Sequence, residues 1–139
     1  MDDKEFLDQL IRHEGYRRSA YQDSEGYWTI GIGRLIDKKL NGGITEDEAK
    51  YLLKNDLDRC ATDLDAKLAW WRALSENRQY VLLNMCFNLG ITKLLGFKNT
   101  LAMIKAGNYE GAAKGMLNSL WARQVKGRAK ELADQMRVG

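Results

Sequence analysis

A carboxylate interrupts the apolar stripe of the first helix that the sequence predicts. Leu7, Leu10 and Ile11 stand at positions i, i+3 and i+4, and position i+7 of the same stripe is Glu14 rather than another hydrophobic residue. Gly15 then ends the helix. A carboxylate on the inward face of a helix end needs a partner or a proton, because an isolated buried charge is costly. Glu14 is therefore a candidate acid, with an ordinary helix-terminal role as the alternative.

A predicted hairpin follows, with a second carboxylate at its turn. The predicted extended segments are Arg17–Gln22 and Tyr27–Gly33. They flank Asp23-Ser24-Glu25-Gly26, which has the composition of a tight turn. Gly31 and Gly33 leave bare the face to which Thr29 also points, and such a face suits the close approach of a bulky ligand. Asp23 is either a turn former or a second acid beside that face.

Two carboxylates in unlike surroundings, one semi-buried and one exposed, are the minimum apparatus for cleaving a glycosidic bond. By spacing alone the indication is weak, because capping and turn roles explain the same residues. The sequence HEGYRRSAYQDSEGYWTIGIGRLI is more specific. It resembles the active-site segment of the phage-type lysozymes, the muramidase family of T-even phage lysozyme (glycoside hydrolase family 24). The family pattern is E-G followed by Y-x-D-x-x-G-x-x-T-I-G-I-G, and similar segments continue over nearly the whole chain.

The resemblance implies an α+β, predominantly helical, two-lobed lysozyme-like fold. It has a small β-hairpin sheet in the N-terminal lobe, a long connecting helix and a helical C-terminal lobe. The chain, 1–139, is then a single lysozyme-like domain with lobes at roughly 12–56 and 69–139 plus the N-terminal helix, joined by the helix 46–68. Thr45 and Glu48 form a capping box at the start of that helix, and an apolar stripe runs along it from Ala49 to Leu68. The later helices are expected after Ser75, between Gly90 and Gly96, over Phe97–Lys105, over Tyr109–Trp121 and from about Gly127.

The resemblance also implies which residues form the site. The catalytic positions are Glu14, the proton donor, with Asp23 and Thr29. Substrate contacts are implied for Leu35, Phe87 and Thr100. Supporting residues are Arg128, which matches the arginine that pairs with the catalytic glutamate, and Arg34 with Asp56, an ion pair expected because Arg34 replaces the family's histidine. Two departures stand out: the passage after Arg34 is much shorter than in the T-even enzyme, and a fourth contact, normally asparagine, falls on Gly115 and is not carried over.

The sequence excludes several other chemistries and places the aromatic residues. Cys60 and Cys86 lie in apolar surroundings typical of reduced core cysteines, so we expect no disulfide. With His13 as the only histidine, a zinc site or a Cys-His or Ser-His catalytic pair has almost nothing to be built from, and we expect no metal and no cofactor. We expect the tryptophans to lie in the core, except Trp28, which is the best candidate for stacking on a sugar.

Charge is divided unevenly along the chain. Residues 1–69 carry 11 Lys/Arg against 15 Asp/Glu, a balance of −4, and residues 70–139 carry 11 against 4, a balance of +7. The basic half is either a solvated surface or a surface that is attracted to an anionic polymer such as nucleic acid or the bacterial envelope. The acidic start is unlike a signal peptide, and no apolar run has the length of a membrane span, so we expect accumulation in the host cytoplasm until release.

Three functions stay open from the sequence. The first is an endolysin-type muramidase that hydrolyses the β-1,4 bond between N-acetylmuramic acid and N-acetylglucosamine in peptidoglycan, by inversion. The second is a lytic transglycosylase, and the third is a catalytically silent wall-binding module on the same fold. Asp23 and Thr29 favour the first, since the other two have no use for a group that activates water. A muramidase of this kind would be a monomer that binds peptidoglycan strands, does not bind nucleic acid and does not insert stably into a membrane. It would need a holin or another route across the inner membrane.

Overall fold

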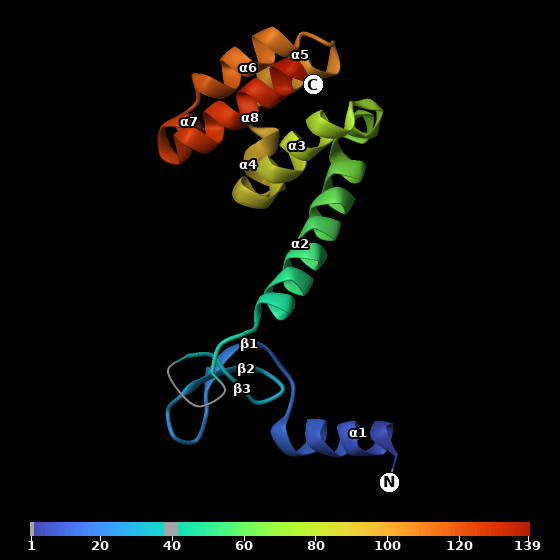
Figure 1. The fold of residues 1–139 in the computed structure, drawn as a ribbon, viewed down its shortest axis with the longest axis vertical. Coiled ribbons are helices and arrows are strands. Elements are labelled where there is room, and N and C mark those ends of the chain that lie inside the picture. The colour runs from blue at the N-terminus through green and yellow to red at the C-terminus, as the bar shows by residue number, and fades with distance from the viewer. Residues whose placement is uncertain (1, 38–41) are drawn as a thin grey trace. The chain divides into compact units, whose positions relative to one another are not determined.

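The structure, a computed structural model, describes residues 2–37 and 42–139. The predicted loop after Arg34 therefore lies partly outside the described residues. Two compact units are present, Met1–Tyr51 and Leu52–Gly139 (Figure 1). The first unit contains α1 (Asp3–Glu14), β1 (Arg17–Gln22), β2 (Trp28–Gly31), β3 (Arg34–Leu35) and the start of α2 (Glu46–Lys67). The α+β, predominantly helical fold class is confirmed, whereas the predicted lobe boundaries stay a prediction.

Helix α1 begins and ends where the sequence predicts. The Asp2 side chain accepts a hydrogen bond from the backbone N–H of Glu5, and the Glu5 side chain accepts one from the N–H of Asp2, which makes a capping box. At the other end, Gly15 has φ of 77° and its N–H donates to the carbonyl of Ile11. That conformation is open to glycine at little cost, so the helix stops with Glu14 as its last residue.

The three strands form an antiparallel sheet in the order β1-β2-β3. Thr29 of the central strand stands opposite Tyr21 of β1 and Leu35 of β3. The predicted strand Tyr27–Gly33 is wrong at its end, because Gly31 and Gly33 both have φ of 69° and turn the chain back into β3. The two glycines thus make a second hairpin, which brings Leu35 beside Thr29.

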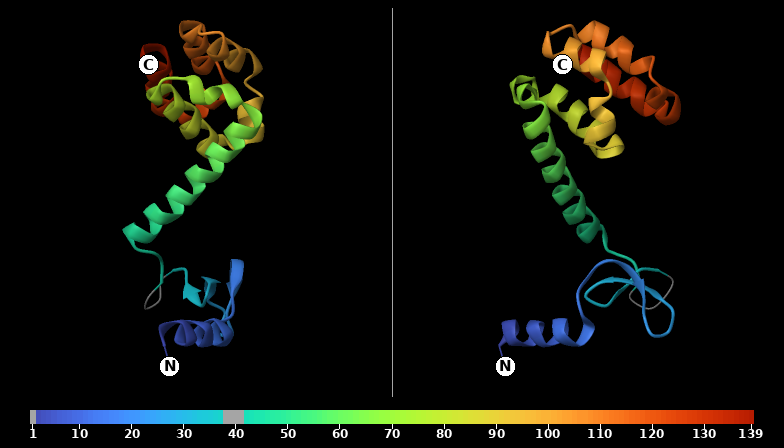
Figure 2. Two further views of the ribbon diagram at one scale, coloured as in Figure 1. Left: turned by 90° about the vertical axis from the view of Figure 1, so that its right-hand side faces the viewer. Right: turned by 180° about the vertical axis from the view of Figure 1, so that it is seen from behind.

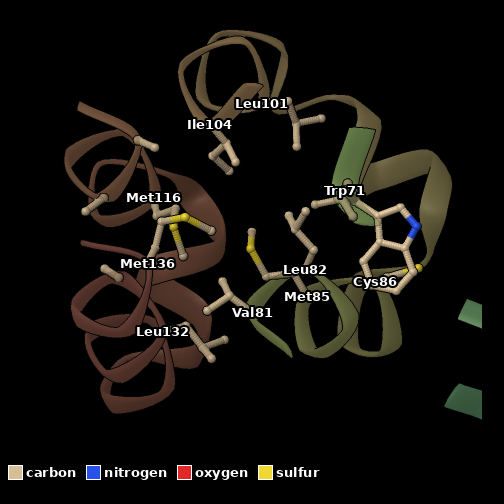
Figure 3. Close-up of a cluster of buried hydrophobic side chains, with 14 of the residues drawn as sticks. Trp71, Val81, Leu82, Met85, Cys86, Leu101, Ile104, Met116, Leu132 and Met136 are labelled. Atoms are coloured by element: carbon tan, nitrogen blue, oxygen red, sulfur yellow. The ribbon is translucent and has the colours of Figure 1, made fainter. Parts of the chain in front are cut away.

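The second unit is helical. Its elements after α2 are the 3-10 helix η1 (Ala69–Ala73), α3 (Glu76–Leu89), α4 (Ile91–Leu95), α5 (Lys98–Lys105), α6 (Tyr109–Leu117), α7 (Leu120–Val125) and α8 (Gly127–Val138). Helices α6 and α8 pack side by side, as both figures of the fold show (Figures 1 and 2). The core combines Val81, Leu82 and Met85 of α3 with Met116 of α6 and Met136 of α8 (Figure 3). Close packing of this kind supplies most of the stability of a small helical unit.

The predicted helix Tyr109–Trp121 is wrong, because it is two helices. Helix α6 ends at Leu117, and the hydroxyl of Ser119 then accepts a hydrogen bond from the N–H of Ala122 as the N-cap of α7. Leu117 and Leu120, on either side of the break, are both exposed.

The tryptophans follow their predicted division. Trp71 and Trp121 are buried at 1% and 3% exposure and Trp70 packs against the core, while Trp28 is 55% exposed.

Candidate active site

Glu14 lies against the turn between β2 and β3. A Cβ atom placed on Gly33 would stand 2.5 Å from Oε2 of Glu14 and 3.0 Å from its Cδ, both closer than ordinary contact allows. A side chain at position 33 would therefore displace this carboxylate from its present position. Glu14 is exposed, which differs from the predicted semi-buried position.

Asp23 organises the turn between β1 and β2. Its Oδ1 atom accepts hydrogen bonds from the backbone N–H groups of Glu25 and Tyr27, each at 2.9 Å. Both donors bind the same oxygen, so the turn does not require Oδ2. Asp23 can therefore form the turn and act in catalysis at the same time, because Oδ1 holds the carboxylate in place and Oδ2 is not needed for the turn.

Thr29 is connected to Asp23 through one residue. The hydroxyl of Thr29 donates to the carbonyl of Tyr27 at 3.1 Å, while the N–H of Tyr27 donates to Asp23. Thr29 is only 3% exposed, and it is the one residue of the first unit's described part that is fully buried. The backbone of Tyr27 thus holds both predicted catalytic side chains in a fixed relation. This connection was absent from the sequence prediction, because a backbone group carries no residue-type signal.

The Arg34 guanidinium binds a carboxylate that the sequence did not predict. Arg34 donates to Glu48 at 2.6 Å, and Glu48 also accepts from the N–H of Thr45 in the predicted capping box. The Thr45 N–H, with a smaller contribution from Arg34, lowers the pKa of Glu48 below its ordinary value. Asp56 pairs with Arg59 one helical turn further on. The Arg34–Asp56 pair joins residues of different units and stays a prediction, as does the pairing of Glu14 with Arg128.

The second unit carries three of the other predicted site residues, Phe87, Thr100 and Arg128. Phe87 and Arg128 line one cavity of about 440 Å³, whose wall also includes Asn84. The Oδ1 atom of Asn84 is buried, and no described residue is its hydrogen-bond partner. The sequence prediction missed this residue, because an asparagine inside an apolar run gives no sign of which way it faces.

Thr100 and Leu35 lie in more enclosed positions. Thr100 of α5 is 6% exposed, and its Oγ1 would stand 2.5 Å from a Cβ atom on Gly115 of α6. Gly115, where the family normally has asparagine, therefore lets the two helices approach around Thr100. Leu35 is half-buried on β3. Sugar contacts by Leu35, Phe87 and Thr100 stay predictions.

Within residues 2–37 and 42–139, no group of three or more His, Cys, Asp or Glu side chains is placed to hold a metal ion. No helix of the described part is long and apolar enough to cross a membrane.

Comparison with known proteins identifies the class of enzyme. The family model of phage lysozymes matches residues 11–136, which include Glu14, Asp23 and Thr29. The fold and this match define a glycoside hydrolase of the lysozyme type. The chain belongs to the phage lysozyme family.

Three relatives match this chain over different shares of their own length. The chain is 35% identical to the pre-baseplate central spike protein Gp5 of Enterobacteria phage T4, over 88% of this chain but 26% of that protein. It is 28% identical to the probable T4-type lysozyme 1 of Dictyostelium discoideum, over 95% of this chain and 93% of that protein. It is 31% identical to the endolysin of Salmonella phage P22, over 86% and 82%. The chain thus spans about a quarter of the spike protein and most of the other two.

Proposed function

We propose that this chain hydrolyses the β-1,4 bond between N-acetylmuramic acid and N-acetylglucosamine in bacterial peptidoglycan, with inversion at the anomeric carbon. Membership of the phage lysozyme family supports a muramidase-type peptidoglycan hydrolase. The observation that supports the finer proposal most is the arrangement of Asp23 and Thr29 on the two sides of the Tyr27 backbone.

In the proposed reaction Glu14 is the general acid. Its proton goes to the glycosidic oxygen as the C–O bond breaks, so that the leaving sugar departs as an alcohol. A carboxylate at a helix end, over a residue without a side chain, leaves space on its open side for a sugar ring. Positive charge then develops at the anomeric carbon of the muramic acid residue.

Asp23 is the general base on the opposite face of the sugar. A water molecule between the free Oδ2 of Asp23 and the Thr29 hydroxyl would lose its proton to the carboxylate as it attacks the anomeric carbon. Inverting glycosidases keep their two carboxyl groups about 6.5–9.5 Å apart to leave room for water. In retaining enzymes, where the second carboxylate is the nucleophile, the two groups are about 5–5.5 Å apart. Thr29 can orient that water because its own position is fixed by burial and by the Tyr27 carbonyl.

The test combines product analysis with one substitution. Glu14→Gln should abolish release of soluble sugar from purified peptidoglycan while leaving the circular dichroism spectrum unchanged, because an amide has no proton to give at this step. Wild-type products should end in reducing muramic acid. A 1,6-anhydro end would identify a lytic transglycosylase, and binding to the wall without release of sugar would identify a silent module.

The wall that this enzyme would cleave lies beyond the inner membrane of the host. We propose a monomer that stays in the host cytoplasm until another protein, such as a holin, opens the inner membrane, and that then acts on the wall. Expression alone should leave a culture intact, and chloroform should then lyse it. Spontaneous lysis on expression would contradict this part while leaving the reaction itself unaffected.

A further inference from the structure

The two cysteines of the chain meet in the second unit. Cys60 lies on α2 and Cys86 on α3, and both side chains line the same surface pocket. Both are free cysteines. The sequence placed each in the core separately, but it could not indicate that residues on two helices, with η1 between them, would lie in one pocket. The Cys60 thiol is also near enough to contribute to the raised pKa of Cys86, so the pair differs chemically from two isolated core thiols.

The pair is accessible from one side. Cys60 and Cys86 line the same surface pocket, of about 310 Å³, together with Asp56, Arg59 and Asp63. Cys60 is half-buried, while Cys86 is 2% exposed and belongs to the hydrophobic core. Figure 3 shows Cys86 on the side of the cluster away from Met116 and Met136. A small reagent that enters the pocket would therefore reach Cys60 before Cys86.

The two thiols differ in reactivity as well. Burial, and then the contact with Cys60, raises the pKa of Cys86 to about 12, so that this thiol keeps its proton at neutral pH. The thiolate is the nucleophile in exchange with disulfides. The first reaction with a disulfide reagent therefore falls to the more exposed Cys60, and the neighbouring Cys86 is in position to resolve the product.

We propose that Cys60 and Cys86 are a site of reversible oxidation, which a low-molecular-weight disulfide such as oxidised glutathione converts into an intramolecular disulfide. In the first step Cys60 loses its proton and its sulfur attacks the reagent, which forms a mixed disulfide and releases one glutathione. In the second step Cys86 loses its proton, its thiolate attacks the sulfur of Cys60, and the departing second glutathione takes up a proton. Two protein thiols and one oxidised glutathione thus give one protein disulfide and two reduced glutathiones.

The cross-link would fasten α2 to α3. It closes a loop that contains η1 and the first part of α3, so it removes conformational freedom from the unfolded chain and stabilises the folded one. An enzyme that is made in a reducing cytoplasm and acts beyond it would become more stable as it meets an oxidising compartment. The site itself does not depend on the proposed hydrolysis, and its test uses no activity assay.

The test compares purified wild-type protein, reduced and then equilibrated with oxidised glutathione, with the variants Cys60→Ser and Cys86→Ala. The wild type should lose the mass of two hydrogen atoms, yield a proteolytic peptide that joins Cys60 to Cys86, and show a melting temperature raised by roughly 5–15 °C. Dithiothreitol should reverse all three changes. Cys86→Ala should stop at a glutathione adduct on Cys60, and Cys60→Ser should show neither the mass loss nor the rise in melting temperature.

Three results would overturn the proposal. In the first, both thiols of the wild type still react with a thiol reagent after treatment with oxidised glutathione. In the second, the reaction of the wild type stops at the glutathione adduct. In the third, the disulfide joins two chains instead of two residues of one chain. The mass measurement on the wild type decides among them even if a variant fails to fold.

Discussion

Replacement of Gly33 by alanine should lower the rate of catalysis far more than its effect on the stability of the protein would explain. The new Cβ would stand 2.5 Å from Oε2 of Glu14, and ordinary contact begins at 3.4 Å, so the carboxylate must move by about 1 Å. A misplacement of about 1 Å in a catalytic group costs on the order of 100-fold in rate. The backbone adds strain, because φ of 69° is unfavourable for alanine by about 1–2 kcal/mol.

Gly31 provides the matched control. It has the same φ of 69°, but a Cβ at this position meets nothing within 4 Å. Gly31→Ala should therefore lower the free energy of unfolding by about as much as Gly33→Ala, by about 1–2 kcal/mol, and keep most of the activity. Urea denaturation measures the first quantity and clearing of a peptidoglycan suspension the second. Equal activity in the two variants would refute the view that Gly33 exists to make room for the Glu14 carboxylate.

Three further predictions concern other residues. Thr29→Glu should put a carboxylate where the proposed water lies and trap a covalent sugar adduct visible by mass spectrometry, whereas Thr29→Ala should lose activity without an adduct; the absence of an adduct in folded Thr29→Glu would contradict the proposed water position. Exchanging Lys93, Lys98 and Lys105 for Glu should lower activity at low salt far more than at high salt if the basic half steers the enzyme to an anionic wall; an unchanged salt profile would leave only the solvated-surface explanation. Hydrogen bonds from Arg72 and Trp71 lower the pKa of Asp65 in the folded protein. The charged Asp65 therefore stabilises the fold at a pH above the ordinary carboxyl pKa, and this stabilisation is lost as the pH falls through the lowered pKa of the folded state. Asp65→Asn should accordingly melt at a lower temperature than the wild type at neutral pH, and the difference should vanish in acid; a difference independent of pH would show that charge is not its cause.

Local signals in the sequence predicted much of the fold. Gly15 ends α1, Ser75 caps α3, and α8 begins at Gly127, where the sequence predicts the last helix. The failures arose where one residue type has two uses. Ser119 could continue a helix or cap the next one, and Gly33 could extend a strand or turn it.

Contacts between distant residues were less predictable than the elements. The motif identified Glu14, Asp23 and Thr29. It could not show that the backbone of Tyr27 binds both Asp23 and Thr29, or that Glu14 lies against Gly33. The resemblance gave Asp56 as the partner of Arg34 and did not indicate Glu48, which Arg34 reaches across 14 positions of the sequence. Choosing between such partners needs the three-dimensional path of the chain.

The stereochemistry of the first product tests the proposed mechanism most directly. Proton NMR of a fresh digest of peptidoglycan fragments distinguishes the two anomers of the new reducing end before they equilibrate. A water activated by Asp23 attacks the face opposite the leaving group, so the β-linked glycan should give the α-anomer first. A β-anomer that appears first would establish a retaining enzyme and contradict the assignment of Asp23 as the base.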